Sequence, residues 1–297
     1  MMGRLCLAVG LSGLRLLGFF TEPSLSVNDI HDVIGEPAAV HRDVPADAVQ
    51  VVTWNIERGT AYDAILSELR RLDADIVFLQ EVDWNCRRTQ YRHVARDLAA
   101  ALEMNWVAAG EFQEIGEGRR GAPALTGQAI LSRFAIEDAN ALRFAAQDRW
   151  RWSINPVQPR RGGRIALTAR TAGLMLYNTH IESGGNQGIK RRQMAEILLH
   201  QSRMNETTPV VIAGDFNNGP LIGSRELGSL TAARFDDALG DAVGRGPTSA
   251  GQSHPIDWIF SKNVATLRGR VVNSTTASDH FPVMAAFKST GALLSSQ

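Results

Sequence analysis

The sequence has little of what marks several common classes of protein. Only two of its 297 residues are cysteine, Cys6 and Cys86, and they lie far apart in dissimilar surroundings, so it carries no disulfide framework. Its 31 basic and 31 acidic residues cancel. No global positive field therefore indicates a nucleic-acid partner, and any site for a polyanion has to be local. No uncharged apolar run reaches the roughly 18 residues of a membrane-spanning helix.

The motifs of several enzyme classes are missing as well. The sequence has neither a cysteine cluster nor an HExxH segment, which disfavours a zinc site. It lacks the GxSxG elbow that carries a nucleophilic serine and a glycine-rich phosphate loop ending in Lys-Ser or Lys-Thr. A hydrolase of non-phosphate esters is disfavoured because that nucleophile motif is absent.

Residues 1–47 show no clear hydrophobic period and are interpreted as an N-terminal tail or leader. The apolar stretch at their start is interrupted by Arg15 and is followed by no small-residue cleavage site. Residues 48–290 continue without a repeat or a boundary and are predicted to form one domain, followed by a C-terminal tail at 291–297. The cysteine pattern favours a cytoplasmic location, and the apolar start leaves export possible.

From residue 49 the pattern becomes regular. Apolar, β-branched runs at residues 49–54 and 74–82 predict buried strands, and apolar residues at helical spacing predict helices at 65–72, with Asp63 in the N-cap region, and at 94–102. Residues 164–169 and 174–179 predict a hairpin because a short loop with Gly173 separates them. Several connections are too short for crossovers, which favours an α/β protein with mixed or largely antiparallel sheets.

Polar side chains lie at one end of each of six predicted strands; Asp279 and His280 are placed in the loop just before theirs. Taken singly, such residues are turn formers, solvated carboxylates or ordinary histidines. Taken together, six strand ends with polar residues imply a common rim where those ends converge. The residues concerned are Asn55 and Glu57, Glu81, Asn178, His180 and Glu182, Asp215 and Asn217, Asp257, and Asp279 and His280.

The inventory of this rim indicates its chemistry. Carboxylate and amide oxygens suit hard cations such as Mg²⁺ or Mn²⁺. A positioned carboxylate can take a proton from water, and imidazoles can donate hydrogen bonds to the oxygens of a pentavalent transition state. The inventory therefore predicts phosphoester hydrolysis.

The segments TWNIE, LQEV, NTHIES, GDFN, IDWIF and SDHFPV, in this order, resemble the endonuclease/exonuclease/phosphatase superfamily. The resemblance spans residues 49–287, and NTHIES is similar to the branches of deoxyribonucleases, sphingomyelinases and tyrosyl-DNA phosphodiesterases. It implies a four-layer α/β sandwich, two mainly antiparallel sheets flanked by helices, with the site at one rim. It also implies a metal-dependent phosphoester hydrolase that uses Mg²⁺ (or Mn²⁺).

The resemblance implies a metal site as well. Asn55 and Glu81 would help to hold the divalent cation, and Asp279 would contribute to the same site. Glu57 lies where some members have an acidic ligand. The sequence departs from many relatives at Gln128, where they carry Asn before the strand.

The remaining roles are implied in the same way. Asp215 would orient or deprotonate the attacking water, and Asn217 would position the phosphate. Asp257 would pair with His280 and fix its tautomer. His180 would face the phosphate from the other side.

The substrate is less determined. Residues 143–170 hold seven arginines against Asp148 alone, with Trp150 and Trp152 among them, a composition that can follow a phosphate backbone and stack on bases. Arg87, Arg88 and Arg92 could extend this basic rim. The preferred substrate is therefore DNA or RNA; a lipid head group, an inositol phosphate or another small phosphoester is the alternative. A catalytically silent binding protein on the same fold is a third possibility, and a monomer without a stable protein partner is expected.

Overall fold

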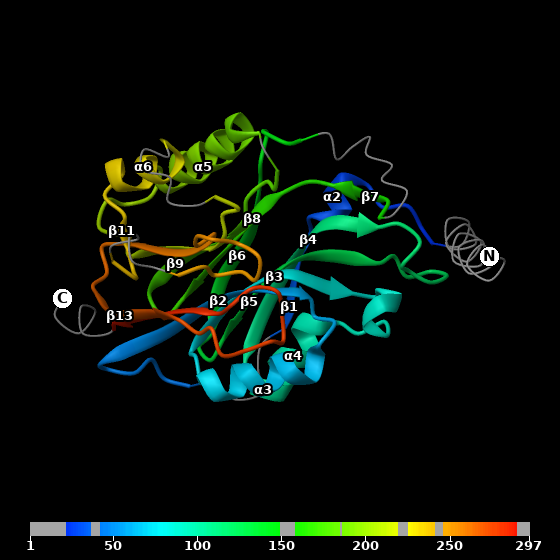
Figure 1. The fold of residues 1–297 in the computed structure, drawn as a ribbon, viewed down its shortest axis with the longest axis horizontal. Coiled ribbons are helices and arrows are strands. Elements are labelled where there is room, and N and C mark those ends of the chain that lie inside the picture. Colours follow the sequence, from blue (N-terminus) through cyan, green and yellow to red (C-terminus); the bar gives the residue numbers. More distant parts are fainter. Residues whose placement is uncertain are drawn as a thin grey trace.

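The computed structural model describes residues 22–36, 42–148, 158–184, 186–218, 225–240 and 246–289. Two β-sheets pack face to face, and helices lie against the outer face of each (Figure 1). The four layers are therefore helix, sheet, sheet and helix.

The first sheet has eight strands. Among its described pairs only β2 and β3 run parallel, and the others are antiparallel. Its order is β1 (Val33–Glu36), β4 (Asn105–Glu114), β5 (Leu125–Ser132), β3 (Ile76–Trp84), β2 (Ala48–Arg58), β14 (Val283–Lys288) and β13 (Thr266–Val271), with β7 (Arg160–Gly162) also paired to β4.

The second sheet has six strands. Within the described residues it too has one parallel pair, β9 with β10. Its order is β11 (Asp236–Asp237), β12 (Asp257–Lys262), β10 (Val210–Asp215), β9 (Leu174–His180), β8 (Ile165–Thr171) and β6 (Ile136–Arg143).

The helices divide between the two outer faces. α3 (Tyr62–Leu72) and α4 (Val94–Leu102) lie against the first sheet, and α5 (Gln187–Gln201) and α6 (Arg225–Ala232) lie on the opposite side, against the second sheet (Figure 1). A short helix α2 (Val27–Ile30) and a 3₁₀ turn η1 (Arg87–Thr89) complete the described elements. None of the described helices combines the length and apolar character needed to cross a membrane.

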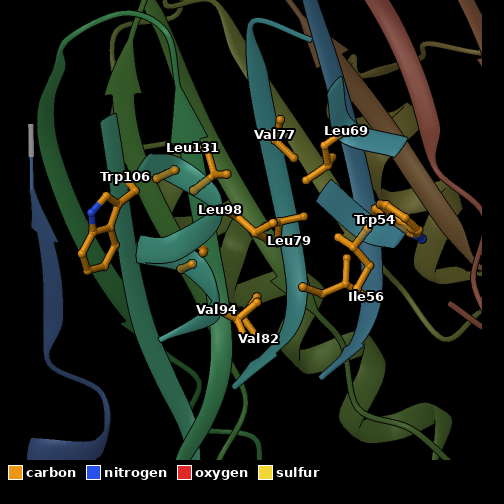
Figure 2. Close-up of a cluster of buried hydrophobic side chains, with 14 of the residues drawn as sticks. Trp54, Ile56, Leu69, Val77, Leu79, Val82, Val94, Leu98, Trp106 and Leu131 are labelled. Atoms are coloured by element: carbon orange, nitrogen blue, oxygen red, sulfur yellow. The ribbon is translucent and has the colours of Figure 1, made fainter. Parts of the chain in front are cut away.

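Three apolar layers hold the sandwich together. Figure 2 shows the layer between the first sheet and its helices, where Leu98 of α4 lies near Leu79 of β3. The layer between the two sheets includes Phe78 and Leu176, and the layer under α5 includes Ile197. These side chains are almost completely buried, and each such burial contributes about 1.5–3 kcal/mol.

The predicted fold class is confirmed: the protein is an α/β sandwich with two mainly antiparallel sheets. The predicted hairpin is β8–β9, whose two-residue turn places Ala172 and Gly173 at φ of 52° and 71°. The N-cap prediction for α3 is wrong. The cap is Ala61, without a side-chain hydrogen bond, and Asp63 lies in the first turn, where its charge complements the helix dipole.

The segment predicted as an N-terminal tail contains two short elements in its described part. β1 pairs with β4, and Ile30 of α2 is buried. The carboxylate of Glu22 accepts hydrogen bonds from the backbone N–H groups of Gly116 and Ala124. Residues 22–36 are therefore packed against the edge of the first sheet.

Candidate active site

Strand register brings three of the predicted residues to one level of the second sheet. Asp215, the last residue of β10, lies opposite His180 on its parallel neighbour β9 and opposite Asp257 on its antiparallel neighbour β12. The residue before it, Gly214, has φ of 147°, and a Cβ there would lie 1.8 Å from the carbonyl oxygen of Thr179. Glycine is therefore needed for β9 and β10 to come this close.

Asp215 lies at the centre of a set of polar contacts. Its Oδ1 accepts the backbone N–H of Asn217 at 2.8 Å, and its Oδ2 accepts Nδ2 of Asn55 at 3.2 Å. Nε2 of His180 is 3.4 Å from the same Oδ2. Burial, together with the nearby charge of Asp257, raises the pKa of Asp215 to about 7, against the opposing effect of His280.

His280 and Asp257 form a buried pair. The Asp257 carboxylate lies 2.9 Å and 3.1 Å from Nδ1 of His280 and also accepts the Thr248 hydroxyl at 2.6 Å. Burial disfavours the imidazolium, but the carboxylates of Asp257 and Asp215 outweigh it and raise the pKa of His280 to about 10. His280 is therefore a charged hydrogen-bond donor at neutral pH.

His180 has the opposite electrostatic state. It is only 2% exposed, and burial together with the Arg164 guanidinium holds its pKa well below its usual range. Its Nδ1 is 3.9 Å from Oε2 of Glu111 and has no hydrogen-bond partner in the described structure. At neutral pH His180 is a neutral imidazole beside the charged His280.

Two residues at the base of the site, Glu111 and Arg164, were missed by the sequence analysis. The Glu111 carboxylate accepts Nη1 of Arg164 at 3.0 Å and Nε2 of Gln128 at 3.1 Å. Burial raises the pKa of Glu111, against the effect of Arg164. The available signal was a charged residue inside one apolar strand, WVAAGEF, and another directly before the apolar strand in RIALTA, which indicates a buried ion pair.

The metal-site residues of the first sheet lie where the strands are irregular. The register of β2 against β3 shifts between Asn55 and Arg58, and the register of β3 against β5 shifts between Leu79 and Val82. Glu57 and Glu81, inside these shifts, have left-handed φ of 46° and 52°. The Glu81 side chain is 30% exposed, and Nε of Arg58 lies 3.9 Å from it.

Asn217 and Asp279 lie in the loops around this rim. Asn217 has φ of 48°, and its Nδ2 donates to the carbonyl of Ile181 at 3.0 Å. Asp279 is exposed, and its carboxylate accepts the hydroxyl of Ser278, which also donates to the carbonyl of Asn55 at 2.7 Å.

Two sets of side chains offer donors to a cation. Asp215, Asp257 and His280 present ligand atoms within 4.8 Å of one another, so this buried group could hold a metal ion. Its Asp257 and His280 are already hydrogen-bonded to each other. Glu81 and Asp279 supply oxygen donors at the solvent-exposed side, and the buried Asn55 amide offers another; hard divalent cations take this type of donor.

The basic residues proposed to contact the substrate have different outcomes. Arg149, Trp150, Arg151 and Trp152 lie outside the described residues. The three arginines after β3 are each paired with a carboxylate: Arg87 with Glu117, Arg88 with Asp83 and Glu114, and Arg92 with Asp97. That cluster therefore adds little net positive charge to the rim.

A sequence model of the endonuclease/exonuclease/phosphatase family matches residues 52–280, about three quarters of the chain. No curated protein sequence matches the chain significantly.

Solved structures share the fold at low sequence identity. An endonuclease/exonuclease/phosphatase from Beutenbergia cavernae is 18% identical with a TM-score of 0.62, over 83% of this chain and 72% of its own. The catalytic domain of human Nocturnin, with bound sulfate, is 14% identical with a TM-score of 0.60, over 86% and 97%. A mannosyl-6-phosphatase from Bacteroides thetaiotaomicron is 18% identical with a TM-score of 0.58, over 80% and 98%.

Proposed function

Because the chain belongs to the endonuclease/exonuclease/phosphatase family, whose members are metal-dependent phosphoester hydrolases, we propose that it is a phosphodiesterase that acts on nucleic acid. The observation that carries the hydrolytic part of this proposal is that His180, Asp215 and Asp257 lie opposite one another on three adjacent strands. That arrangement places a base, a neutral imidazole and the partner of a charged imidazole around one point.

Asp215 is the proposed base. A carboxylate with a pKa of about 7 can accept a proton from water near neutral pH, whereas an ordinary aspartate is too weak a base. The hydrogen bonds from Asn55 and the Asn217 backbone leave the carboxylate little rotational freedom. It therefore orients the water as well as accepting its proton.

The histidines act on the phosphoryl oxygens. His280, held as imidazolium by Asp257, donates a hydrogen bond to an oxygen on which negative charge develops. His180 is neutral and lies on the other side of Asp215, from which it donates without repelling His280. Asn217 fixes the phosphate position from the loop that follows β10.

Asn55, Glu81 and Asp279 are the residues proposed to hold the cation, which we expect to be Mg²⁺ or Mn²⁺. When bound, the cation polarises the phosphoryl group and neutralises its charge. Since Glu81 is partly exposed, a cation can reach this side of the site from solvent.

The choice of nucleic acid rests on the arginines and tryptophans at residues 149–152 and remains a proposal. A small phosphoester is the second candidate. It is favoured by the pairing of Arg87, Arg88 and Arg92 with carboxylates, because paired arginines are less available to a phosphate backbone. A monomer in the cytoplasm, without a stable protein partner, is part of the same proposal.

The test is a substrate panel with Mg²⁺, with Mn²⁺ and with EDTA. It contains plasmid and single-stranded DNA, RNA, bis-p-nitrophenyl phosphate, sphingomyelin, inositol phosphates and a hexose 6-phosphate. We expect turnover of DNA or RNA and of bis-p-nitrophenyl phosphate that EDTA abolishes. Turnover confined to the hexose or inositol phosphates would overturn the nucleic-acid assignment, and no metal-dependent turnover at all would overturn the mechanism.

Replacing Arg149 and Arg151 with alanine tests the assignment of the substrate-contact segment. We expect KM for single-stranded DNA to rise about tenfold, the effect of lost phosphate contacts, while the rate on bis-p-nitrophenyl phosphate stays unchanged. The matched control is Arg192→Ala, an exposed arginine on α5. An equal loss on both substrates would contradict a role in DNA binding.

A further inference from the structure

Helix α5 directs a row of polar side chains toward the loops that frame the candidate active site. Lys190, Gln193 and Glu196 are three residues apart and therefore share one side of the helix. Lys190 and Gln193 are buried, at 4% and 0% exposure. Buried polar side chains need partners, and each of these finds its partner in a loop backbone.

Lys190 contacts the loop that follows β10. Its Nζ donates to the carbonyl oxygen of Asn217 at 2.6 Å. The sequence places this cation near the start of a helix, where it opposes the helix dipole and hints at contact with an anion. In the structure Nζ donates to a peptide carbonyl, and the charge strengthens that hydrogen bond.

Asn217 is a junction between two site loops. Its backbone has left-handed φ of 48°, a conformation that asparagine adopts more readily than most residues other than glycine. Its N–H donates to Asp215 and its Nδ2 donates to the carbonyl of Ile181, the residue after His180. Lys190 binds the third polar group of the same residue, so it fixes the turn that orients Asp215.

Gln193 and Glu196 extend the contacts to two further loops. Oε1 of Gln193 accepts the N–H of Glu182, and its Nε2 donates to the carbonyl of Ala146, both at 2.9 Å. The Glu196 carboxylate accepts the N–H groups of Ala145 and Ala146 at 2.7 Å and 3.0 Å. In the sequence, Ala146 lies three residues before Arg149.

We propose that this polar row on α5 positions the active-site loops and that its members act on different steps. Lys190 is a positioning residue for catalysis because it sets the Asp215–Asn217 turn. Glu196 is a positioning residue for substrate binding because it holds the loop that leads to Arg149. The assignment of steps rests on the proposed function, whereas the loop contacts stand without it.

The first test compares Lys190→Met with Lys190→Arg. We expect Lys190→Met to lower kcat about 10- to 100-fold on both single-stranded DNA and bis-p-nitrophenyl phosphate, with KM within twofold, because small misplacements of reacting groups have effects of this size. Lys190→Arg restores the charged donor and should recover most of kcat. The control is Arg192→Met, which removes an exposed charge from the same helix.

A parent-like kcat in Lys190→Met, or a loss equally large in Arg192→Met, would overturn the role of Lys190. Failure of Lys190→Arg to recover any activity would reduce Lys190 to a packing residue. A second measurement works without turnover. Hydrogen exchange in peptides covering residues 181–183 and 215–218 should accelerate at least tenfold in Lys190→Met and stay unchanged in Arg192→Met, at an unchanged melting temperature of the core.

This second measurement separates the two proposals. If the parent protein hydrolyses no phosphoester while exchange accelerates as expected, the function is wrong and the loop contact is right. If the parent protein hydrolyses a phosphoester but Lys190→Met changes neither kcat nor hydrogen exchange, the function is right and the role of the loop contact is wrong.

The second test concerns Glu196. Glu196→Ala should raise KM for single-stranded DNA several-fold and leave kcat and KM for bis-p-nitrophenyl phosphate within twofold. Glu137→Ala, which removes an exposed glutamate from β6, is the control for the change of charge. A Glu196→Ala phenotype identical to that of Lys190→Met would contradict the division of steps.

Discussion

The two halves of the rim are built in opposite ways. On the second sheet, His180, Asp215 and Asp257 are side by side because unbroken strand register places them there, and all three are buried. On the first sheet, Glu57 and Glu81 lie within register shifts, with left-handed backbone. We call the half on the second sheet the regular half, because regular strand pairing fixes it, and the half on the first sheet the irregular half, because breaks in strand pairing shape it.

The difference matches what each half has to do. Proton transfer needs groups at fixed separations away from bulk water, and paired strands between two packed layers provide both. A cation has to enter from solvent and keep water ligands, which requires an exposed lip. A left-handed backbone at a non-glycine residue costs about 1–3 kcal/mol. Glu57 and Glu81 adopt this conformation, so the surrounding structure has to offset its cost.

The comparison predicts that the regular half carries the larger share of catalysis. Asp215→Asn keeps the size and the hydrogen bond that Oδ1 accepts from the Asn217 N–H, but it removes the base, so kcat should fall about 10³-fold or more. The fold should lose at most about 1 kcal/mol, because the lost hydrogen bond from Asn55 is offset by the removal of one of two adjacent buried carboxylate charges. Rates at saturating metal and a thermal melt check both expectations.

The control for Asp215→Asn is Asp138→Asn, an exposed aspartate on β6. A melting temperature lowered by several degrees, with activity lost in proportion, would show that Asp215 serves the fold rather than the reaction.

The irregular half should respond through metal affinity. Glu81→Gln keeps the side-chain length but removes a charged ligand, so the metal concentration that gives half-maximal activity should rise about 10- to 100-fold. At saturating metal, kcat should return to within a few-fold of the parent value. Metal titration of activity, together with calorimetric titration of metal into the protein, provides the check.

A Glu81→Gln variant that loses kcat at every metal concentration, with unchanged metal affinity, would erase the distinction between the two halves. The matched control is Glu57→Gln, in the neighbouring register shift, which tests whether a second carboxylate takes part.

The regular half could largely be predicted from the sequence, and the irregular half only in part. Apolar strands that end at His180 and Asp215, and one that begins at Asp257, imply a shared rim where these strand termini meet. The shifts at Glu57 and Glu81 depend on backbone pairing between distant strands, and nothing local in TWNIE or LQEV specifies them.

Buried partners were the hardest to predict. Glu111 and Arg164 are about 50 residues apart in the sequence and meet because β7, which ends two residues before Arg164, pairs with β4 next to Glu111. The position of Lys190 near the start of a helix says nothing about its contact with a carbonyl in another loop. In each case the missing information is a tertiary contact, which no local pattern contains.

The smallest effect on turnover is expected from changing His93, which packs against the end of β3 behind the irregular half of the rim. The His93 ring stacks on the ring of Trp84, the last residue of β3, with 5.5 Å between the ring centroids. His93 is also the N-cap of α4, and its Nδ1 accepts a hydrogen bond from the N–H of Arg96. Burial, with a smaller contribution from the Arg96 charge, lowers the pKa of His93 to about 4. The folded protein therefore favours the neutral ring.

Below pH 6.5 the unfolded chain binds a proton at His93 that the folded protein does not bind until about pH 4. The contribution of His93 to stability should therefore be complete above pH 6.5 and fall by about 1 kcal/mol per pH unit as pH drops through this window. His93→Asn keeps a capping oxygen but cannot titrate, so its urea-unfolding free energy should lose this slope, while His254→Asn, outside the aromatic cluster, should keep it. If the unfolding free energies of the parent and of His93→Asn depend on pH in the same way, protonation of His93 does not affect stability. The contact between His93 and the end of β3 then contributes through packing alone.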